Sequence, residues 1–438
     1  MMLPNKPIAI VDGVRTPFAK AFGAFIDVSA VELGRTALEA VLLRCGLSAS
    51  DIDEVIFGNV AGPPDSANVA RVIALKAGVP HDRIAHTVNR NCASGMESIF
   101  AGCSRIREGR ATTIVAGGTE SMSQIPMLWS HEAAKGWLRL ARSKSMLDRL
   151  RTLASMRPRH FKPVAGIELG LTDPVSGLNM GETAEVLAKE FHVTRDQQDA
   201  FAMESHRKAS EAQEACFLSG EVTGVTLSSG ETIERDNGPR KNQTLEQLGR
   251  LRPLFGREGT ITAGNSCPLT DGAAALVLSD PDKLDQFSRP PLGYITAYSI
   301  AGCDPRRMGL GPVYATAKLF AETGMSFADF DHVEINEAFA AQVLACERAF
   351  GSKGFAENEW SRSTAVGELP MDRVNVHGGA IALGHPVGTT GTRLVLTLLR
   401  TLKANGKQRG LATLCVGGGQ GVAIVVESVY PDPSGPRI

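Results

Sequence analysis

The amino-acid sequence predicts an α/β protein made of two copies of one topology, with a large segment inserted into the first copy. Three stretches from the first part of the chain match three stretches from the second part, in the same order. Self-similarity of this kind is the signature of a duplicated architecture, and three matches in one order are not expected by chance. The matched stretches are 46–57 with 324–335, 113–118 with 413–418, and 272–279 with 421–428.

The first matched pair predicts a helix end, a turn and a short strand. Apolar residues recur at helical spacing from Leu33 to Leu43 and from Ala315 to Ala321, so a helix precedes each copy. Gly46 and Gly324 then suit a left-handed helix end, because glycine has no side chain to clash there. A serine two residues later can cap the turn that leads into the strand.

The second and third pairs predict buried strands that meet at glycines. In the second half one strand follows the other at once, as in a hairpin, whereas about 150 residues separate them in the first half. Hairpin tips lie at the surface and tolerate insertions, so we expect an inserted domain there. The expected division is 1–122 with 258–290 as the first half, 123–257 as the inserted domain, and 291–438 as the second half.

The inserted segment is mostly helical in pattern. Residues 181–216 predict two helices that meet near Thr194, which can form a capping box with Gln197. Residues 131–163 hold nine Lys and Arg but few acidic residues, and their apolar residues recur near helical spacing. A basic amphipathic stretch can lie on an anionic membrane or dock on a partner. It can also pack on its own protein or face a phosphate-bearing ligand.

Composition excludes several classes of protein. The 438 residues are 43% hydrophobic and 21% charged, with a net charge of −1, which argues against nucleic-acid binding through a broad basic face. Eight cysteines without a Cys-x-x-Cys pair indicate neither a disulfide scaffold nor a zinc site, and favour the cytoplasm or another reducing compartment. The chain enters an apolar strand at 8–11, and no basic region followed by a long apolar stretch suggests a secretory signal. No apolar segment is long enough to span a bilayer.

Four sites could carry chemistry. Cys92 stands at the start of a helix that runs to about Arg107, where backbone N–H groups and the helix dipole should lower the pKa of the thiol. The alternative for any such cysteine is a small buried apolar residue. Cys415 ends a strand that runs into three glycines, and His385 lies in a loop before a helix. Asn336 follows the repeated strand of the second half.

The predicted duplication brings these residues together, because ligands gather at the carboxyl ends of parallel strands. Two thiols, a histidine and an asparagine at one such edge would suit acyl transfer through a thioester. One thiol would attack, and the other would move a proton to and from carbon or sulfur.

With these residues in place, the sequence resembles the thiolase family over essentially the whole chain. The resemblance implies two βαβαβαββ halves in a five-layer αβαβα sandwich, with a mostly helical loop domain inserted in the first half. The similar motifs are Val14–Phe18, Asn91–Gly95, Asn336–Phe339, Gly378–Pro386 and Cys415–Gly421.

The resemblance also implies a role for each residue. Cys92 would accept the acyl group, and His385 would activate it and form one oxyanion hole with a water held by Asn336. Cys415 would be the acid and base for the acetyl-CoA carbon. The backbone N–H groups of Cys92 and Gly417 would form the second oxyanion hole. CoA and acyl-CoA are then substrates, and neither a metal nor a redox cofactor is required.

Two positions depart from the family pattern. His377 stands where many members have asparagine, which could rearrange hydrogen bonds near the site. Cys267 stands where several relatives have a serine near the pantetheine arm of CoA, and a thiol is the weaker hydrogen-bond partner. Ser266 is adjacent but would point elsewhere. Ser266 and Cys267 are therefore the candidate CoA contacts.

Within the family, segments 180–185 and 269–274 resemble thiolases of fatty-acid β-oxidation, and 131–163 resembles their membrane-contacting loop. We therefore expect a cytoplasmic 3-ketoacyl-CoA thiolase that forms homodimers or homotetramers. A β-oxidation partner or peripheral membrane contact would use 131–163. Acetoacetyl-CoA thiolase is the alternative. A decarboxylating ketosynthase would not need Cys415, and a binding protein without turnover would not need all four site residues.

Overall fold

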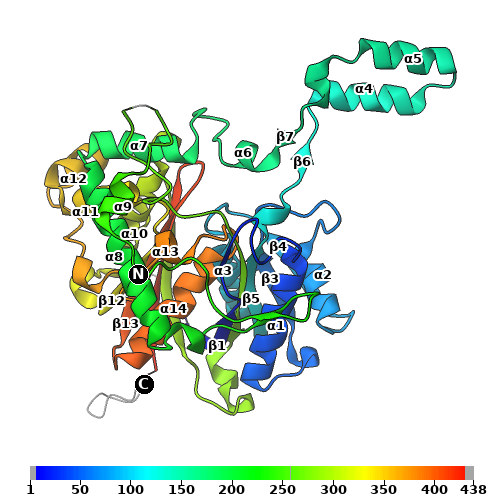
Figure 1. Cartoon of the computed structure of the whole chain (residues 1–438). Coiled ribbons are helices and arrows are strands. Elements are labelled where there is room, and N and C mark those ends of the chain that lie inside the picture. Colours follow the sequence, from blue (N-terminus) through cyan, green and yellow to red (C-terminus); the bar gives the residue numbers. More distant parts are fainter. Residues whose placement is uncertain (1–5, 257, 430–438) are drawn as a thin grey trace.

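The computed structural model describes residues 6–256 and 258–429 (Figure 1). Its main sheet has the strand order β12-β13-β14-β11-β1-β10-β5-β3-β4, and β2 pairs with β10. The strands are β1 (Ile8–Arg15), β2 (Ala19–Lys20), β3 (Glu54–Gly58), β4 (Ile84–Val88), β5 (Thr113–Glu120), β10 (Thr270–Ser279), β11 (Gly293–Gly302), β12 (His332–Ile335), β13 (Arg409–Val416) and β14 (Gln420–Ser428).

The strand order confirms the duplication. The run β1-β10-β5-β3 in the first half matches β11-β14-β13-β12 in the second, and the two runs join where residues 8–10 of β1 pair with β11. β13 and β14 form the expected antiparallel hairpin, and β5 pairs antiparallel with β10 although the insertion separates them. One difference in the second half is that the counterpart of β4 is reduced to a bridge between Val333 and Val374.

The helices cover both sheet faces and fill the space between the halves. On β10, Leu276 and Leu278 contact a central cluster with α3 and α14, whereas Ala275 and Val277 contact α1 and α2. β14 alternates in the same way between the central cluster and α10 and α11. The layers therefore confirm the five-layer sandwich. The helices are α1 (Ala30–Cys45), α2 (Val69–Lys76), α3 (Ser94–Arg107), α10 (Gly311–Thr323), α11 (Ala340–Gly351), α12 (Lys353–Trp360), α13 (Ala380–Leu383) and α14 (Thr390–Ala404).

The duplicated helix ends form as the sequence predicts. Gly46 ends α1 at φ 68° and Gly324 ends α10 at φ 75°, both in the left-handed region that glycine reaches without strain. Ser48 and Ser326 each form a capping box in the turn that follows. Each turn is followed by a parallel strand, β3 in the first half and β12 in the second.

The two edges of the main sheet differ. Beyond β12, the Asn375 side chain bonds both the N–H and the C=O of Ile335, and its backbone N–H bonds the C=O of Val333. The Asn375 amide thus makes the hydrogen bonds to β12 that a neighbouring strand would otherwise make. At the other edge, β4 has β3 as its single strand neighbour within the described residues, and Asn68 bonds the carbonyl of Ala85.

The inserted segment is helical, as predicted, and Thr194 with Gln197 forms the expected capping box between α7 and α8. A buried ion-pair cluster fastens it to the core, because Arg15 on β1 bonds Glu221 and Asp236. The predicted domain boundaries stay a prediction. The segment contains β6 (Met127–Leu128), α4 (His131–Arg142), α5 (Met146–Ser155), β7 (Val164–Ala165), α6 (Gly166–Gly170), α7 (Met180–Glu190), α8 (Arg195–Glu214), β8 (Val225–Thr226), β9 (Thr232–Ile233) and α9 (Leu245–Gly249).

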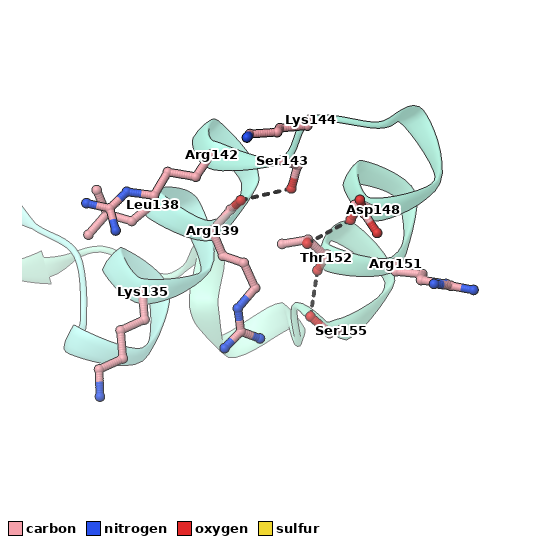
Figure 2. A pocket seen from close by; sticks show the side chains of 10 residues that line it. All are labelled: Lys135, Leu138, Arg139, Arg142, Ser143, Lys144, Asp148, Arg151, Thr152 and Ser155. Atoms are coloured by element: carbon pink, nitrogen blue, oxygen red, sulfur yellow. Dashed lines mark hydrogen bonds between the residues drawn. The ribbon is translucent and has the colours of Figure 1, made fainter.

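The basic stretch forms a helical hairpin of α4 and α5. Figure 1 shows this hairpin projecting from the body of the molecule on a narrow neck formed by β6 and β7. An open groove of about 820 Å³ lies along the two helices, well away from the central helices (Figures 1 and 2). No helix within the described ranges is long and apolar enough to cross a bilayer.

Candidate active site

The two central helices, α3 and α14, bring the loops that carry Cys92 and His385 together in the layer between the two halves. Cys92 lies two residues before α3, and His385 lies five residues before α14. The first turns of these helices touch, because a Cβ on Gly95 would lie 2.7 Å from the backbone nitrogen of Thr392. Only glycine permits this approach, so the close contact sets where the two loops meet.

Cys92 is half-buried in a tight turn. Asn91 holds φ at 44°, and the Ser94 hydroxyl bonds back to the Asn91 carbonyl. Burial raises the pKa of the Cys92 thiol, while the backbone N–H groups of Gly417 and of Cys92 itself lower it. The expectation of a depressed thiol pKa is therefore wrong, because desolvation outweighs the helix end. Cys92 rests as a thiol that needs a base.

Gly417 is fixed beside Cys92 by the second half of the chain. The Asn91 side-chain amide donates to the Gly417 carbonyl at 2.7 Å, and the Gly417 N–H lies near enough to the Cys92 sulfur to lower the pKa of that thiol. A Cβ on Gly417 would lie 3.3 Å from the Met180 sulfur, which closes this side of the site. Two backbone N–H groups beside one sulfur are suited to bind an oxyanion on the attached carbon.

His385 is positioned to act as a base. Its Nδ1 lies 2.6 Å from the Thr390 hydroxyl, and that hydroxyl donates to the Pro386 carbonyl. Nδ1 must then carry the hydrogen, which leaves the buried Nε2 with a free lone pair and no partner among the described residues. Burial lowers the pKa of His385 to about 4, and the charge of Arg393 adds to this effect. The imidazole is therefore neutral at pH 7.

Asn336 follows β12, and its backbone N–H bonds the Thr413 carbonyl at 3.0 Å. The side chain is fully buried, yet neither Oδ1 nor Nδ2 has a hydrogen-bond partner within the described residues. Buried amides are normally satisfied, so this one is available to a water or to substrate. The neighbouring Glu337 is satisfied by Ser205, Asn375 and the Ile381 N–H.

Cys415 and Cys267 place two more thiols near Cys92. Cys415 is buried against Met308 and Ala338, and burial and the nearby Cys92 raise its pKa well above the ordinary value. Burial and Cys92 also raise the pKa of Cys267 to about 12. Both are therefore protonated at neutral pH, and Cys415 can act as an acid.

The candidate CoA contacts differ in what they offer. The Ser266 hydroxyl donates to the Thr262 carbonyl at 2.7 Å, whereas the Cys267 backbone N–H bonds the Ala338 carbonyl and its thiol lies near Cys92. CoA contact by either residue stays a prediction. His377, which departs from the family pattern, stacks on Phe217 of the inserted segment at 3.7 Å between ring centroids. This histidine therefore makes a packing contact.

Sequence reasoning missed several supporting residues. Thr390 fixes the tautomer of His385, Asn91 fixes Gly417, and Met180 closes the site from the inserted segment. Glu120 accepts four hydrogen bonds, one of them from the N–H of Gly388 in the His385 loop. Asn91 and Thr390 stand within five residues of Cys92 and His385, which is the signal that could have found them.

Comparison with known proteins agrees with this geometry. The chain matches the thiolase N-terminal domain over residues 8–282 and the thiolase C-terminal domain over residues 289–428. It is 38% identical to the 3-ketoacyl-CoA thiolases of Yersinia enterocolitica and Yersinia pestis, over 96% of this chain and 96% of each relative.

Solved structures show the same relationship. The acetyl-CoA acetyltransferase of Bacillus anthracis superposes with a TM-score of 0.85 at 35% identity, over 97% of this chain and 100% of that chain. The human mitochondrial 3-ketoacyl-CoA thiolase in complex with CoA superposes with a TM-score of 0.83 at 33% identity, over 97% of this chain and 99% of that chain. Fold, site and comparisons agree, and the chain belongs to the thiolase family of acyltransferases.

Proposed function

We propose that this protein is a 3-ketoacyl-CoA thiolase of fatty-acid β-oxidation. It would cleave a 3-ketoacyl-CoA with CoA into acetyl-CoA and an acyl-CoA shortened by two carbons. The observation that carries this proposal is the placement of the Gly417 backbone, held by Asn91, beside Cys92, where the N–H groups of both residues lower the pKa of the Cys92 thiol. The 3-ketoacyl-CoA thiolases at 38% identity over nearly full length support the choice of substrate.

In the first half-reaction, His385 Nε2 takes the Cys92 proton, and the thiolate attacks the C3 carbonyl of the substrate. The N–H groups of Cys92 and Gly417 bind the oxyanion that forms. The C2–C3 bond then breaks, leaving the acyl group on Cys92 and an enolate of acetyl-CoA. Protonated His385 and a water on Asn336 stabilise the enolate oxygen. The Cys415 thiol protonates C2, and acetyl-CoA leaves.

The second half-reaction returns every proton. The Cys415 thiolate takes the proton of the incoming CoA thiol, and the CoA thiolate attacks the acyl group on Cys92. The same two N–H groups bind the second oxyanion. When this intermediate collapses, acyl-CoA leaves and the Cys92 thiolate recovers its proton from His385. The residues already present supply the nucleophile, the base, the acid and both oxyanion sites.

The test is CoA-dependent thiolysis by the purified protein, with acetoacetyl-CoA and 3-ketohexadecanoyl-CoA compared at equal concentration. Strong turnover of the long substrate is the expected result. Turnover confined to acetoacetyl-CoA would favour the acetoacetyl-CoA thiolase alternative, which the similarity to the Bacillus anthracis acetyl-CoA acetyltransferase supports. Absence of thiolysis with either substrate would contradict both.

We propose further that the hairpin of α4 and α5 binds an anionic membrane surface from the cytoplasm. Met146 is 70% exposed, and Leu138, Leu147 and Leu150 are each more than half exposed, so an apolar surface accompanies the basic one. Figure 2 shows Arg139 directed into the groove, whereas Arg142 and Arg151 point outward. The exposed cations without an ion pair to a described residue include Lys135, Arg139, Arg142, Lys144, Arg149 and Arg151.

Vesicle co-sedimentation tests this binding. A cation near an anionic bilayer contributes about 1 kcal/mol, so replacing four should weaken binding to phosphatidylglycerol vesicles about a thousandfold. The hairpin variant replaces Arg139, Arg142, Lys144 and Arg151 by Gln. The matched control replaces four exposed lysines elsewhere, Lys283, Lys318, Lys353 and Lys403. Equal binding by both variants would contradict membrane contact, and capture of a β-oxidation enzyme without vesicle binding would favour a protein partner.

We also propose that two copies form a homodimer through β4. An edge strand with one neighbour can pair with its own copy, and Ile84 on this strand is 59% exposed. Light scattering after size exclusion should give a dimer for the wild type and a monomer for Ile84→Lys. Leu43→Lys, at a residue 84% exposed on α1, is the control and should stay dimeric. A tetramer that survives Ile84→Lys would refute this interface.

A further inference from the structure

One face of α14 bonds four separate parts of the chain. Thr390, Arg393, Thr397 and Arg400 follow each other at spacings of three and four residues, so they share one side of the helix. Thr390 holds His385, and Arg393 bonds Glu334 on β12. Thr397 bonds Glu221 of the inserted segment, and Arg400 bonds Asp12 on β1. The first two of these bonds involve the segments that carry site residues.

The Arg393–Glu334 pair lies between those two segments. Arg393 is one turn after Thr390, whose hydroxyl holds the imidazole of His385. Glu334 is two residues before Asn336, so their side chains leave the extended chain on the same side. The 3.0 Å bond from Arg393 Nη1 to Glu334 Oε2 thus joins the helix that orients His385 to the strand that carries Asn336.

The burial of the Arg393–Glu334 pair indicates that the pair fixes the relative position of α14 and β12. The exposed fraction is 0% for the Arg393 side chain and 2% for the Glu334 side chain, and Arg393 Nε and Nη2 have no partner within the described residues. Burial raises the pKa of the Glu334 carboxyl although the Arg393 charge lowers it, so the loss of hydration offsets the attraction and the pair contributes little net stability. The Arg393 charge also acts on Glu337 and on His385. The Arg393 guanidinium therefore acts on three residues that the second half of the chain contributes to the site region, Glu334, Glu337 and His385.

We propose that Arg393 and Glu334 are positioning residues that fix the distance between His385 and Asn336. This inference rests on the proposed function, in which both groups stabilise the same enolate oxygen. If the pair is broken, β12 and the start of α14 can shift relative to each other. A displacement near 1 Å in such a site can lower the rate about a hundredfold. Binding of CoA is unaffected, since neither residue is a predicted CoA contact.

The experiment measures kcat and KM for acetoacetyl-CoA thiolysis in four variants. Arg393→Met removes the pair, Arg393→Lys keeps the charge without the planar fork, and Glu334→Gln keeps the shape without the charge. Arg400→Met is the matched control, because Arg400 lies on the same face of α14 but bonds Asp12 at the far end. Melting temperature is measured for each variant, so that loss of stability is separated from loss of rate.

We expect Arg393→Met to lower kcat at least about tenfold with KM within twofold, and Glu334→Gln to lower it less. Arg393→Lys should recover part of the rate. Arg393→Met should also move the acid limb of the kcat–pH profile to higher pH, because the cation beside His385 is gone. Arg400→Met should keep the wild-type kcat and the wild-type acid limb.

The positioning role is overturned if Arg393→Met keeps kcat within twofold, or if Arg400→Met loses as much. Equal changes in kcat and KM would also overturn it. If Arg393→Met does not fold, Glu334→Gln and Arg393→Lys decide by the same criteria. A wild-type protein inactive on every 3-ketoacyl-CoA would overturn the proposed function as well, whereas an active wild type with unaffected variants overturns the positioning role alone.

Discussion

The neutral state of buried His385 has a measurable effect on stability. In the unfolded chain a histidine takes up a proton near pH 6.5, whereas burial and Arg393 lower the pKa of His385 in the folded protein to about 4. Between these values the unfolded state binds the extra proton. The contribution of His385 to the free energy of unfolding is therefore complete above pH 6.5, and it is lost as pH falls toward 4. The shift corresponds to about 3 kcal/mol, of which about 2.5 kcal/mol is lost by pH 4.5.

The assay compares the free energy of unfolding in urea for the wild type and His385→Gln, from pH 7.5 to pH 4.5, at one protein concentration. Other titrating groups, including buried His206 with its pKa lowered to about 4, remain in both proteins and cancel in the difference. The wild type should approach or fall below the variant's stability as pH falls. His81→Gln, at an exposed histidine, is the control and should run parallel to the wild type. If the free energy of unfolding of His385→Gln changes with pH in parallel with that of the wild type, His385 is not a neutral buried imidazole and the reasoning is refuted.

Three further predictions concern the site and its frame. Cys92→Ala should abolish thiolysis and leave acyl-CoA binding measurable by calorimetry, and appreciable turnover would contradict its role. Asn336→Ala should lower kcat about a hundredfold with little change in KM, as for the loss of one oxyanion-hole group. Gly118→Ala should lower the melting temperature strongly, because its Cβ would lie 2.0 Å from the Gly388 carbonyl oxygen. Gly170→Ala has open space and should melt as the wild type does.

Local signals made the fold predictable. Gly46 and Gly324 mark equivalent helix ends, and Thr194 with Gln197 marks a helix start, so each needs only its neighbours in sequence to form. The reduction of the β4 counterpart to one bridge was not predictable. Its cause is the Asn375 side chain, which occupies the backbone groups of a strand about 40 residues away in sequence.

The sequence predicted which residues form the site, and their catalytic roles stay a prediction, but it did not predict their electrostatics. Cys92 was expected to have a lowered pKa from its helix end, but segments far away in sequence bury it and raise that pKa. The stacking of His377 on Phe217 likewise joins residues 160 positions apart, which no local pattern indicates. Contacts with CoA, including those of Ser266 and Cys267, depend on the bound substrate and stay predictions.

The unequal edges of the main sheet bear on how copies of this chain would pair in the proposed homodimer. At β12 the Asn375 amide already occupies the backbone groups that an incoming strand would need. Within the described residues, β4 is the edge of the main sheet that has no such amide along its backbone, although Asn68 bonds the Ala85 carbonyl, and in the proposed homodimer two copies would pair there. A sheet open at both ends could add copies without limit, as fibrils do. If the proposed homodimer forms through β4, the Asn375 side chain at the opposite edge would therefore limit pairing of the main sheet to two copies.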